Sequence, residues 1–270
     1  LHAGRRGRTL EPMPYETVAG QRLFFARHKG PEEKAPTLLL VHGAGGSRLE
    51  WPAELRRMPN AAVYVLDLPG HGRSELPGRD RIEDYVSVVL AFIEKAGLRD
   101  VVVLGWSMGG AIAQMIGLQR PPAIVGLILM STGARLRVMD ALLEGIVDDF
   151  QETTELIVDN VWSDGVPPEM VEASRRRLQE TDPAVVHGDY VACNRFDVMD
   201  RLGEIGLPVL VINGTDDRMT PLKYGRYLAE EIPDARLVVV EGAGHMVALE
   251  EPEAVASAVR RFLDALPAGT

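Results

Sequence analysis

A serine flanked by glycines is the clearest candidate for chemistry in this chain. Residues 105–109 read GWSMG, directly after the apolar residues 101–104 and directly before the helix-like residues 108–119. A serine on a sharp strand-to-helix turn needs small residues two positions to either side, and its hydroxyl then stands clear of the sheet. The positive end of the helix dipole lies beside that hydroxyl. Ser107 is therefore the candidate nucleophile, and an incidental serine in a glycine-rich turn is the weaker interpretation.

A serine hydroxyl needs a base to take its proton. His245 lies in the glycine-rich residues 241–246 (EGAGHM), just after the apolar residues 237–240. A flexible loop at a strand end suits an exposed imidazole. His245 also follows the serine and the candidate acids in the order Ser, Asp, His that is typical of one class of triad hydrolase. These features favour His245 as the general base over an ordinary exposed loop histidine.

The base needs a carboxylate that fixes its tautomer. Residues 213–221 (NGTDDRMTP) follow the apolar residues 209–212 and offer two adjacent aspartates. Neighbouring side chains after a strand point to opposite sides, so one of the two is expected to face the histidine. Asp217 is the favoured orienting acid, and Asp216 is the alternative, expected instead to be a turn residue.

Acyl transfer also needs donors for the negative oxygen that develops on the carbonyl. Residues 42–46 (HGAGG) follow the apolar residues 37–41, and their glycines allow the backbone to approach a substrate. The backbone N–H groups of Ala44 and Met108 are the expected oxyanion donors. A phosphate-binding loop is excluded because the segment lacks the P-loop lysine and the spacing of a dinucleotide fingerprint.

These motifs need a scaffold, and the hydrophobic pattern indicates a doubly wound α/β sheet of about eight strands. Short apolar runs typical of buried parallel strands alternate with helical patterns. The runs are residues 37–41, 61–66, 101–104, 124–130, 209–212 and 237–240, and the helices are 82–95, 108–119, 222–231 and 252–266. Residues 15–18 and 23–27 read as an opening hairpin.

One long segment lacks strands and predicts a helical cap. Residues 133–206 contain amphipathic helical patterns at 138–150, 154–162, 168–180 and 184–193. The predicted core is thus formed by residues 13–132 and 207–267, whereas residues 1–12 read as a leader ahead of Met13. The cap has sixteen acidic and seven basic residues, which accounts for −9 of the chain's net charge of −10. Such a surface repels nucleic acid and anionic membranes, so neither is an expected partner.

Composition places the chain among ordinary globular proteins. Its 270 residues are 46% hydrophobic and 25% charged, and no apolar run approaches the roughly 20 residues that span a bilayer. Cys193 is the single cysteine, so the chain forms no intrachain disulfide and no cysteine zinc site, which fits a reducing cytoplasm. No motif requires a metal or a cofactor, and none indicates an oligomeric state.

From residue 15 to residue 266 the chain resembles the α/β-hydrolase superfamily. The motifs HGAGG, DLPGHGRS at residues 67–74, GWSMGG, GTDDRMTP and GAGH occur in the family's order. The resemblance implies the α/β-hydrolase fold and the triad of Ser107, Asp217 and His245. It also implies that DLPGHGRS is a structural loop rather than a metal site. Relatives that remove halogen or open epoxides have aspartate in place of this serine, so those reactions are disfavoured.

The expected activity is hydrolysis of a carboxylic ester or lactone through an acyl-enzyme. A small or medium acyl group is favoured, with acyl-homoserine lactones and enol-lactones among the candidates because similar proteins include lactonases. The alternatives are a cofactor-free haloperoxidase or perhydrolase, a carbon–carbon bond hydrolase and, less favoured, a non-catalytic ligand receptor. The candidate pocket residues are Trp106, Phe150, Trp162, Asn194 and Met219.

Overall fold

The computed structural model describes residues 14–28 and 35–266, so the predicted leader at 1–12 lies outside the described residues. Within them, eight strands form one sheet in the order β1-β2-β4-β3-β5-β6-β7-β8. The first two strands pair antiparallel and β2 runs antiparallel to β4, while the remaining pairs are parallel. The strands are β1 (Tyr15–Val18), β2 (Gln21–His28), β3 (Thr37–Val41), β4 (Ala62–Leu66), β5 (Val101–Trp106), β6 (Ile124–Met130), β7 (Val209–Gly214) and β8 (Ala235–Val240).

Helices cover both faces of the sheet, which explains why its inner strands are continuous apolar runs. Alternate residues of β3 face opposite layers: Leu39 belongs to one buried cluster and Leu38 to the other. The helices α2 (Ile82–Lys95), α3 (Met108–Gln119) and α8 (Leu222–Glu231) contribute to the first cluster. The second receives α1 (Ala53–Arg56), α9 (Val247–Glu250) and α10 (Pro252–Ala265). The predicted doubly wound α/β architecture is confirmed.

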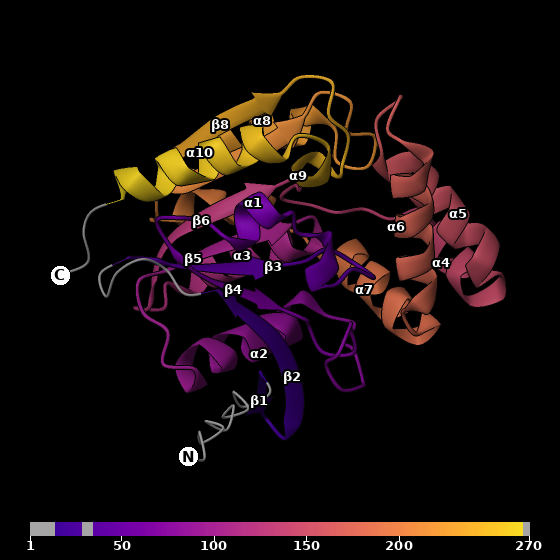
Figure 1. Ribbon diagram of the computed structural model, residues 1–270, viewed down its shortest axis with the longest axis horizontal. Helices are drawn as coiled ribbons and strands as arrows, with labels where there is room; N and C mark the ends of the chain where they lie inside the picture. Colours follow the sequence, from indigo (N-terminus) through magenta and orange to yellow (C-terminus); the bar gives the residue numbers. More distant parts are fainter. Residues whose placement is uncertain (1–13, 29–34, 267–270) are drawn as a thin grey trace, which may run out of the picture.

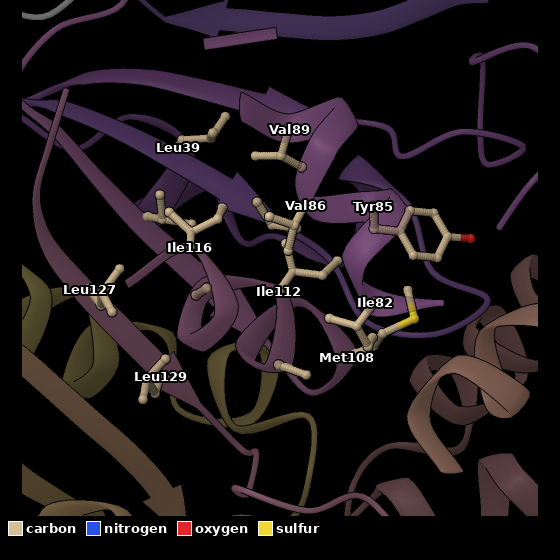
Figure 2. Packing of buried hydrophobic residues seen from close by; sticks show 14 of the residues in the cluster. Leu39, Ile82, Tyr85, Val86, Val89, Met108, Ile112, Ile116, Leu127 and Leu129 are labelled. Atoms are coloured by element: carbon tan, nitrogen blue, oxygen red, sulfur yellow. The ribbon is translucent and has the colours of Figure 1, made fainter. Parts of the chain in front are cut away.

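Figure 2 shows the first of these layers at close range, with side chains from α2 and α3 meeting on the sheet. Val86 and Val89 of α2 lie near Ile112 and Ile116 of α3. All four are fully buried, as is Leu39 in the strand beneath them. Burying each such side chain contributes about 1.5–3 kcal/mol. This packing fixes α3, and with it the turn that precedes α3, against the sheet.

The register of the parallel strands brings the functional motifs to one edge. Val41 at the end of β3 pairs with Gly105 of β5, and Met130 of β6 pairs with both Trp106 and Ile212. The last residues of β7 and β8 are likewise paired. Loops that follow these strands therefore leave the sheet side by side, as expected for the carboxyl edge of a parallel sheet.

Between β6 and β7 the chain forms the helices α4 (Asp140–Asp148), α5 (Phe150–Val161), α6 (Pro168–Glu180) and α7 (Pro183–Arg195), here called the helical insertion. They lie together on one side of the sheet in Figure 1. The break between α4 and α5 falls where the predicted helix at 138–150 continued, because the Asp149 side chain accepts the Glu152 N–H and begins a new helix. The short 3₁₀-helices η1 (Arg48–Glu50) and η2 (Met199–Glu204) complete the described elements.

A narrow neck joins the helical insertion to the sheet. Arg135 and Asp197 form an isolated antiparallel bridge, and their side chains form an ion pair at 2.7 Å. The Val198 N–H also donates to the carbonyl of Ala134 at 2.9 Å. The incoming and outgoing segments therefore run side by side. No helix in the described part of the chain is long and apolar enough to cross a bilayer.

Candidate active site

Ser107 occupies a strained turn between β5 and α3. Its backbone has φ +54° and ψ −116°, outside the regions that non-glycine residues favour. The turn is possible because a Cβ on Gly105 would collide with the backbone of Gly109, and a Cβ on Gly109 would collide with the carbonyl of Val41. Both glycines of the GWSMG motif are thus required by close backbone packing. Strain held by the surrounding fold is typical of functional sites.

Two hydrogen bonds from β6 and its following loop hold this turn. The Ser107 N–H donates to the Met130 carbonyl at 2.9 Å, and the Thr132 hydroxyl donates to the Ser107 carbonyl at 2.8 Å. The end of β6 and the residues that follow it therefore support the serine backbone.

His245 and Asp217 are in direct contact. Nδ1 of His245 lies 3.0 Å from each carboxylate oxygen of Asp217. Both residues are almost fully buried, and they come from the loops after β8 and β7. Asp216 is exposed, and its carboxylate accepts the hydroxyl of Thr215 at 2.9 Å. The structure thus places Asp217, rather than Asp216, beside the histidine.

Asp217 is held as an acceptor by its own loop. Its carboxylate accepts the N–H groups of Met219 and Thr220 at 2.9 and 2.8 Å and the Thr220 hydroxyl at 2.8 Å. Burial alone would raise the pKa of Asp217, but the charge and hydrogen bond of His245 and the bonds from Thr220 outweigh burial and lower it. The carboxylate is therefore ionised at neutral pH and suited to bind the Nδ1–H of His245.

The loop that contains His245 is held by Trp106 and by the helical insertion. The indole N–H of Trp106 donates to the His245 carbonyl at 3.0 Å, and the two rings lie 5.4 Å apart. On either side, the Gly244 N–H donates to the Glu250 carboxylate at 2.9 Å and the Met246 N–H donates to the Val161 carbonyl at 3.1 Å. Trp106 thus packs beneath the site and also lines its cavity.

Ser107 and His245 line one cavity of about 120 Å³. Ala44 lines it as well, and Met108 follows the serine at the start of α3. Within the described residues, the backbone N–H groups of Ala44 and Met108 donate to no other protein group. Met108 itself is fully buried and does not line the cavity.

The walls of this cavity are mainly apolar, and α5, α6 and α7 of the helical insertion contribute to them. Trp106 and Met219 lie on the wall. Phe150, Trp162 and Asn194 were also predicted to line the pocket, but they do not line this cavity. Further apolar wall residues are Leu136, Val138, Ile157, Val158, Val161, Leu178, Cys193 and Met246.

The three predicted residues that do not line the cavity have structural contacts instead. Trp162 is buried in the core cluster of α9 and α10, and Phe150 packs against the same cluster. The side-chain carbonyl of Asn194 accepts the Val138 N–H at 3.1 Å, and the backbone carbonyl of Asn194 accepts a guanidinium N–H of Arg137 at 3.0 Å. Asn194 therefore fixes the segment that leads into α4.

Sequence reasoning missed several polar groups on the cavity wall: Glu50, Arg137, Ser174, Tyr190 and Tyr224. Glu50 had a recognisable signal, because Ser47 and Glu50 have the spacing of a capping box, and that box is formed around η1. Burial raises the pKa of the Glu50 carboxyl despite its bonds from Ser47. Arg137, Ser174 and Tyr190 depend on how the helical insertion docks, whereas Tyr224 lies on α8.

No group of three metal-ligating side chains occurs within residues 14–28 and 35–266. The Asp67 carboxylate accepts the Arg48 N–H and guanidinium, each at 2.7 Å, and the Arg73 N–H at 3.0 Å. His71 contacts Asp189 of α7. These contacts give Asp67 and His71 structural partners, as the sequence predicted.

Known proteins resemble the whole of this arrangement. A pimeloyl-[acyl-carrier protein] methyl ester esterase of Yersinia enterocolitica is 28% identical over 241 residues, which cover 83% of this chain and 92% of the esterase. The crystal structure of the enol-lactonase from Burkholderia xenovorans LB400 superposes with a TM-score of 0.86 at 25% identity, covering 93% of this chain and 100% of that one. A thermophilic esterase has a TM-score of 0.79 at 32% identity, covering 93% and 96%. The model of the Alpha/beta hydrolase family matches residues 38–258, and the chain therefore belongs to this family.

Proposed function

We propose that this protein is a serine hydrolase that cleaves a carboxylic ester or lactone of small or medium acyl size. The observation that carries the proposal is the placement of His245 between a buried carboxylate, 3.0 Å from its Nδ1, and the cavity that it shares with Ser107. Nucleophile, orienting acid and base follow β5, β7 and β8 at the same edge of the sheet, and they have the roles that the triad mechanism requires.

In the proposed reaction Ser107 Oγ attacks the carbonyl carbon while His245 Nε2 takes its proton. The carbonyl oxygen becomes an oxyanion, which the N–H groups of Ala44 and Met108 bind. His245 then protonates the departing alkoxide, and the acyl group remains on Ser107. A water, deprotonated by the same histidine, releases the acid and restores the serine. Asp217 holds the imidazole in the tautomer with hydrogen on Nδ1 throughout.

The cavity supports a compact substrate. Its volume of about 120 Å³ lies below the range of roughly 300–1,000 Å³ typical of drug-sized ligand sites. Apolar side chains of α5 and α6 line the same cavity as the serine, so we propose that the helical insertion is a cap that binds the acyl group. Relatives named for methyl ester, enol-lactone and ester hydrolysis agree with this class of substrate.

Acid release in a pH-stat tests the proposal. Aryl esters of increasing acyl length and several lactones would be compared for the native protein, Ser107→Ala and Ser87→Ala. Ser87 is an exposed serine on α2, so its loss controls for the substitution itself. Removing Ser107 should lower turnover by a factor on the order of 10⁶.

The relative turnover of esters and lactones then assigns the substrate class. Undiminished hydrolysis by Ser107→Ala would refute the proposed nucleophile. Absence of turnover by the native protein on every ester and lactone would refute the function and favour a perhydrolase, a carbon–carbon hydrolase or a receptor.

A further inference from the structure

Gly45, the residue that follows the proposed oxyanion donor Ala44, is held by the helical insertion. The N–H of Gly45 donates to the Asp189 carboxylate of α7 at 2.8 Å, and its carbonyl accepts the hydroxyl of Thr181 at 3.1 Å. A Cβ on Gly45 would collide with Leu178 of α6. Gly45 has φ +64°, a conformation that favours glycine. Both polar groups of this residue are thus fixed by partners outside the sheet.

Asp189 is a fully buried carboxylate that the proposed chemistry does not use. One of its oxygens accepts the Gly45 N–H and faces Nε2 of His71 at 2.8 Å, while the other accepts the hydroxyl of Tyr85. A buried carboxylate without a counter-charge is strongly unfavourable, so the fold must supply one. His71 is the side chain placed to do so.

The geometry indicates that the His71 ring is an imidazolium. Its Nδ1 lies 2.9 Å from the Pro69 carbonyl oxygen and its Nε2 lies 2.8 Å from the carboxylate of Asp189, so both nitrogens face acceptors. A neutral ring would leave one nitrogen lone pair directed at an oxygen. Burial alone would lower the pKa of His71, but the charge and hydrogen bond of Asp189, aided by the Pro69 carbonyl and Asp67, outweigh burial and raise it.

The other groups that face His71 are consistent with a single positive charge. The His42 ring lies 4.8 Å away, accepts the Leu68 N–H at Nε2 and faces its neighbour's carbonyl with Nδ1, which is the pattern of a neutral imidazole. Burial and the nearby His71 lower the pKa of His42 to about 3. Tyr85 faces His71 from α2, and burial raises the pKa of this tyrosine well above its ordinary value.

We propose that Asp189, paired with the His71 imidazolium, is a positioning residue for the oxyanion hole: it holds Gly45, and with it the Ala44 N–H, from the helical insertion. The inference rests on the proposed function, because the oxyanion hole acts only if the protein transfers an acyl group. It means that the helical insertion helps to complete the catalytic machinery as well as covering the substrate. A displacement of about 1 Å in a catalytic group can lower the rate roughly 100-fold.

The variant Asp189→Asn preserves the shape of the side chain, but it replaces the charged acceptor of the Gly45 N–H with a weaker neutral one and removes the charge that pairs with His71. We expect kcat on the best ester of the panel to fall about 10- to 100-fold with KM changed less than about threefold. The affinity for a trifluoromethyl ketone, whose oxygen becomes an oxyanion when Ser107 adds to it, should fall by the same factor. A merely structural role would lower the melting temperature and leave both quantities unchanged per folded molecule.

Asp197→Asn is the matched control. It makes the same chemical change in the same segment of the chain and removes the ion pair with Arg135 at the neck, away from Gly45. Its kcat and its affinity for the ketone should equal those of the native protein. Histidine ¹⁵N NMR gives a further readout: both nitrogens of His71 should be protonated in the native protein at neutral pH, and not in Asp189→Asn.

Thr181→Val keeps the proposal testable if Asp189→Asn does not fold. It removes one hydrogen bond to the Gly45 carbonyl, so kcat and the affinity for the ketone should both fall about 2- to 10-fold. The inference would be overturned if a folded Asp189→Asn variant had the native kcat and the native affinity for the ketone. If Asp189→Asn does not fold, native values of these two quantities in Thr181→Val would overturn it. In either case Ser107→Ala would still decide independently whether the protein is a serine hydrolase.

Discussion

Replacement of Asp217 by asparagine tests the proposed mechanism most directly. The carbonyl oxygen of the new side chain would remain where Oδ1 now accepts the N–H groups of Met219 and Thr220. The amide nitrogen would then take the place of Oδ2, facing Nδ1 of His245 at 3.0 Å and the hydroxyl of Thr220 at 2.8 Å. The retained oxygen also lies 3.0 Å from Nδ1 of His245 but already accepts two backbone N–H groups. The amide N–H that faces Nδ1 therefore favours the tautomer of His245 that accepts at Nδ1 and holds its proton on Nε2.

This tautomer cannot take the proton of Ser107. In triad hydrolases the corresponding change lowers kcat by about 10⁴ while the geometry stays intact. At 1.36 kcal/mol for each factor of ten, that equals a loss of about 5.5 kcal/mol of transition-state stabilisation. The two backbone donors to Oδ1 leave the amide one favourable orientation, so we expect the full effect here.

The assay is the steady-state kcat of native, Asp217→Asn and Asp216→Asn proteins on one activated ester. Asp216 is the adjacent, exposed carboxylate and makes a well-matched control. We expect its substitution to change kcat less than about twofold, since exposed charges away from the site have small effects. A loss of less than tenfold in Asp217→Asn, or an equal loss in Asp216→Asn, would refute the assignment of the acid.

Three further expectations concern the scaffold and the cavity. Gly105→Ala should lower the free energy of unfolding by about 3 kcal/mol in urea titrations, because the new methyl group meets the backbone of Gly109; unchanged stability would contradict the close packing of the turn. Leu178→Ala enlarges the cavity and should shift the highest kcat/KM toward longer acyl groups, whereas an unchanged preference would place the acyl group elsewhere. Glu50→Gln should raise the melting temperature at neutral pH. Burial raises the pKa of Glu50, so the native protein loses stability as pH rises from 4.5 through that raised value. The neutral glutamine avoids this loss. The gain should vanish below pH 4.5, and a gain that is independent of pH would contradict it.

The sheet and the loops at its edge could be predicted because their signals are local. Apolar runs such as residues 37–41 are buried on both faces, which few other structures allow. The glycines at 105 and 109 report a close backbone approach, and chain order then pointed to Asp217 and His245. The predicted runs match β3 and β6, whereas β5 and β7 continue two residues further than predicted, and Gly105 and Trp106 still pair with β6.

The cavity wall could not be predicted in the same way. Periodicity shows that Trp162 and Phe150 belong to apolar helix faces, but only the docking of the helical insertion decides which partner each face meets. Tyr190 lies in a helix whose apolar residues are buried nearly all round, so its place on the wall has no signal in the sequence. Asn194 was selected for its polarity, yet that polarity satisfies a backbone N–H at the start of the insertion.

The neck formed by Arg135 and Asp197 has an evolutionary consequence. Because its two segments leave and rejoin the sheet side by side, the distance between β6 and β7 does not depend on what lies beyond them. A recombination event at this point would exchange one set of helices for another while the strands that precede the serine and the histidine keep their pairing. Substrate preference could then diversify as an interchangeable module, provided that each incoming module again presents an acceptor to the N–H of Gly45.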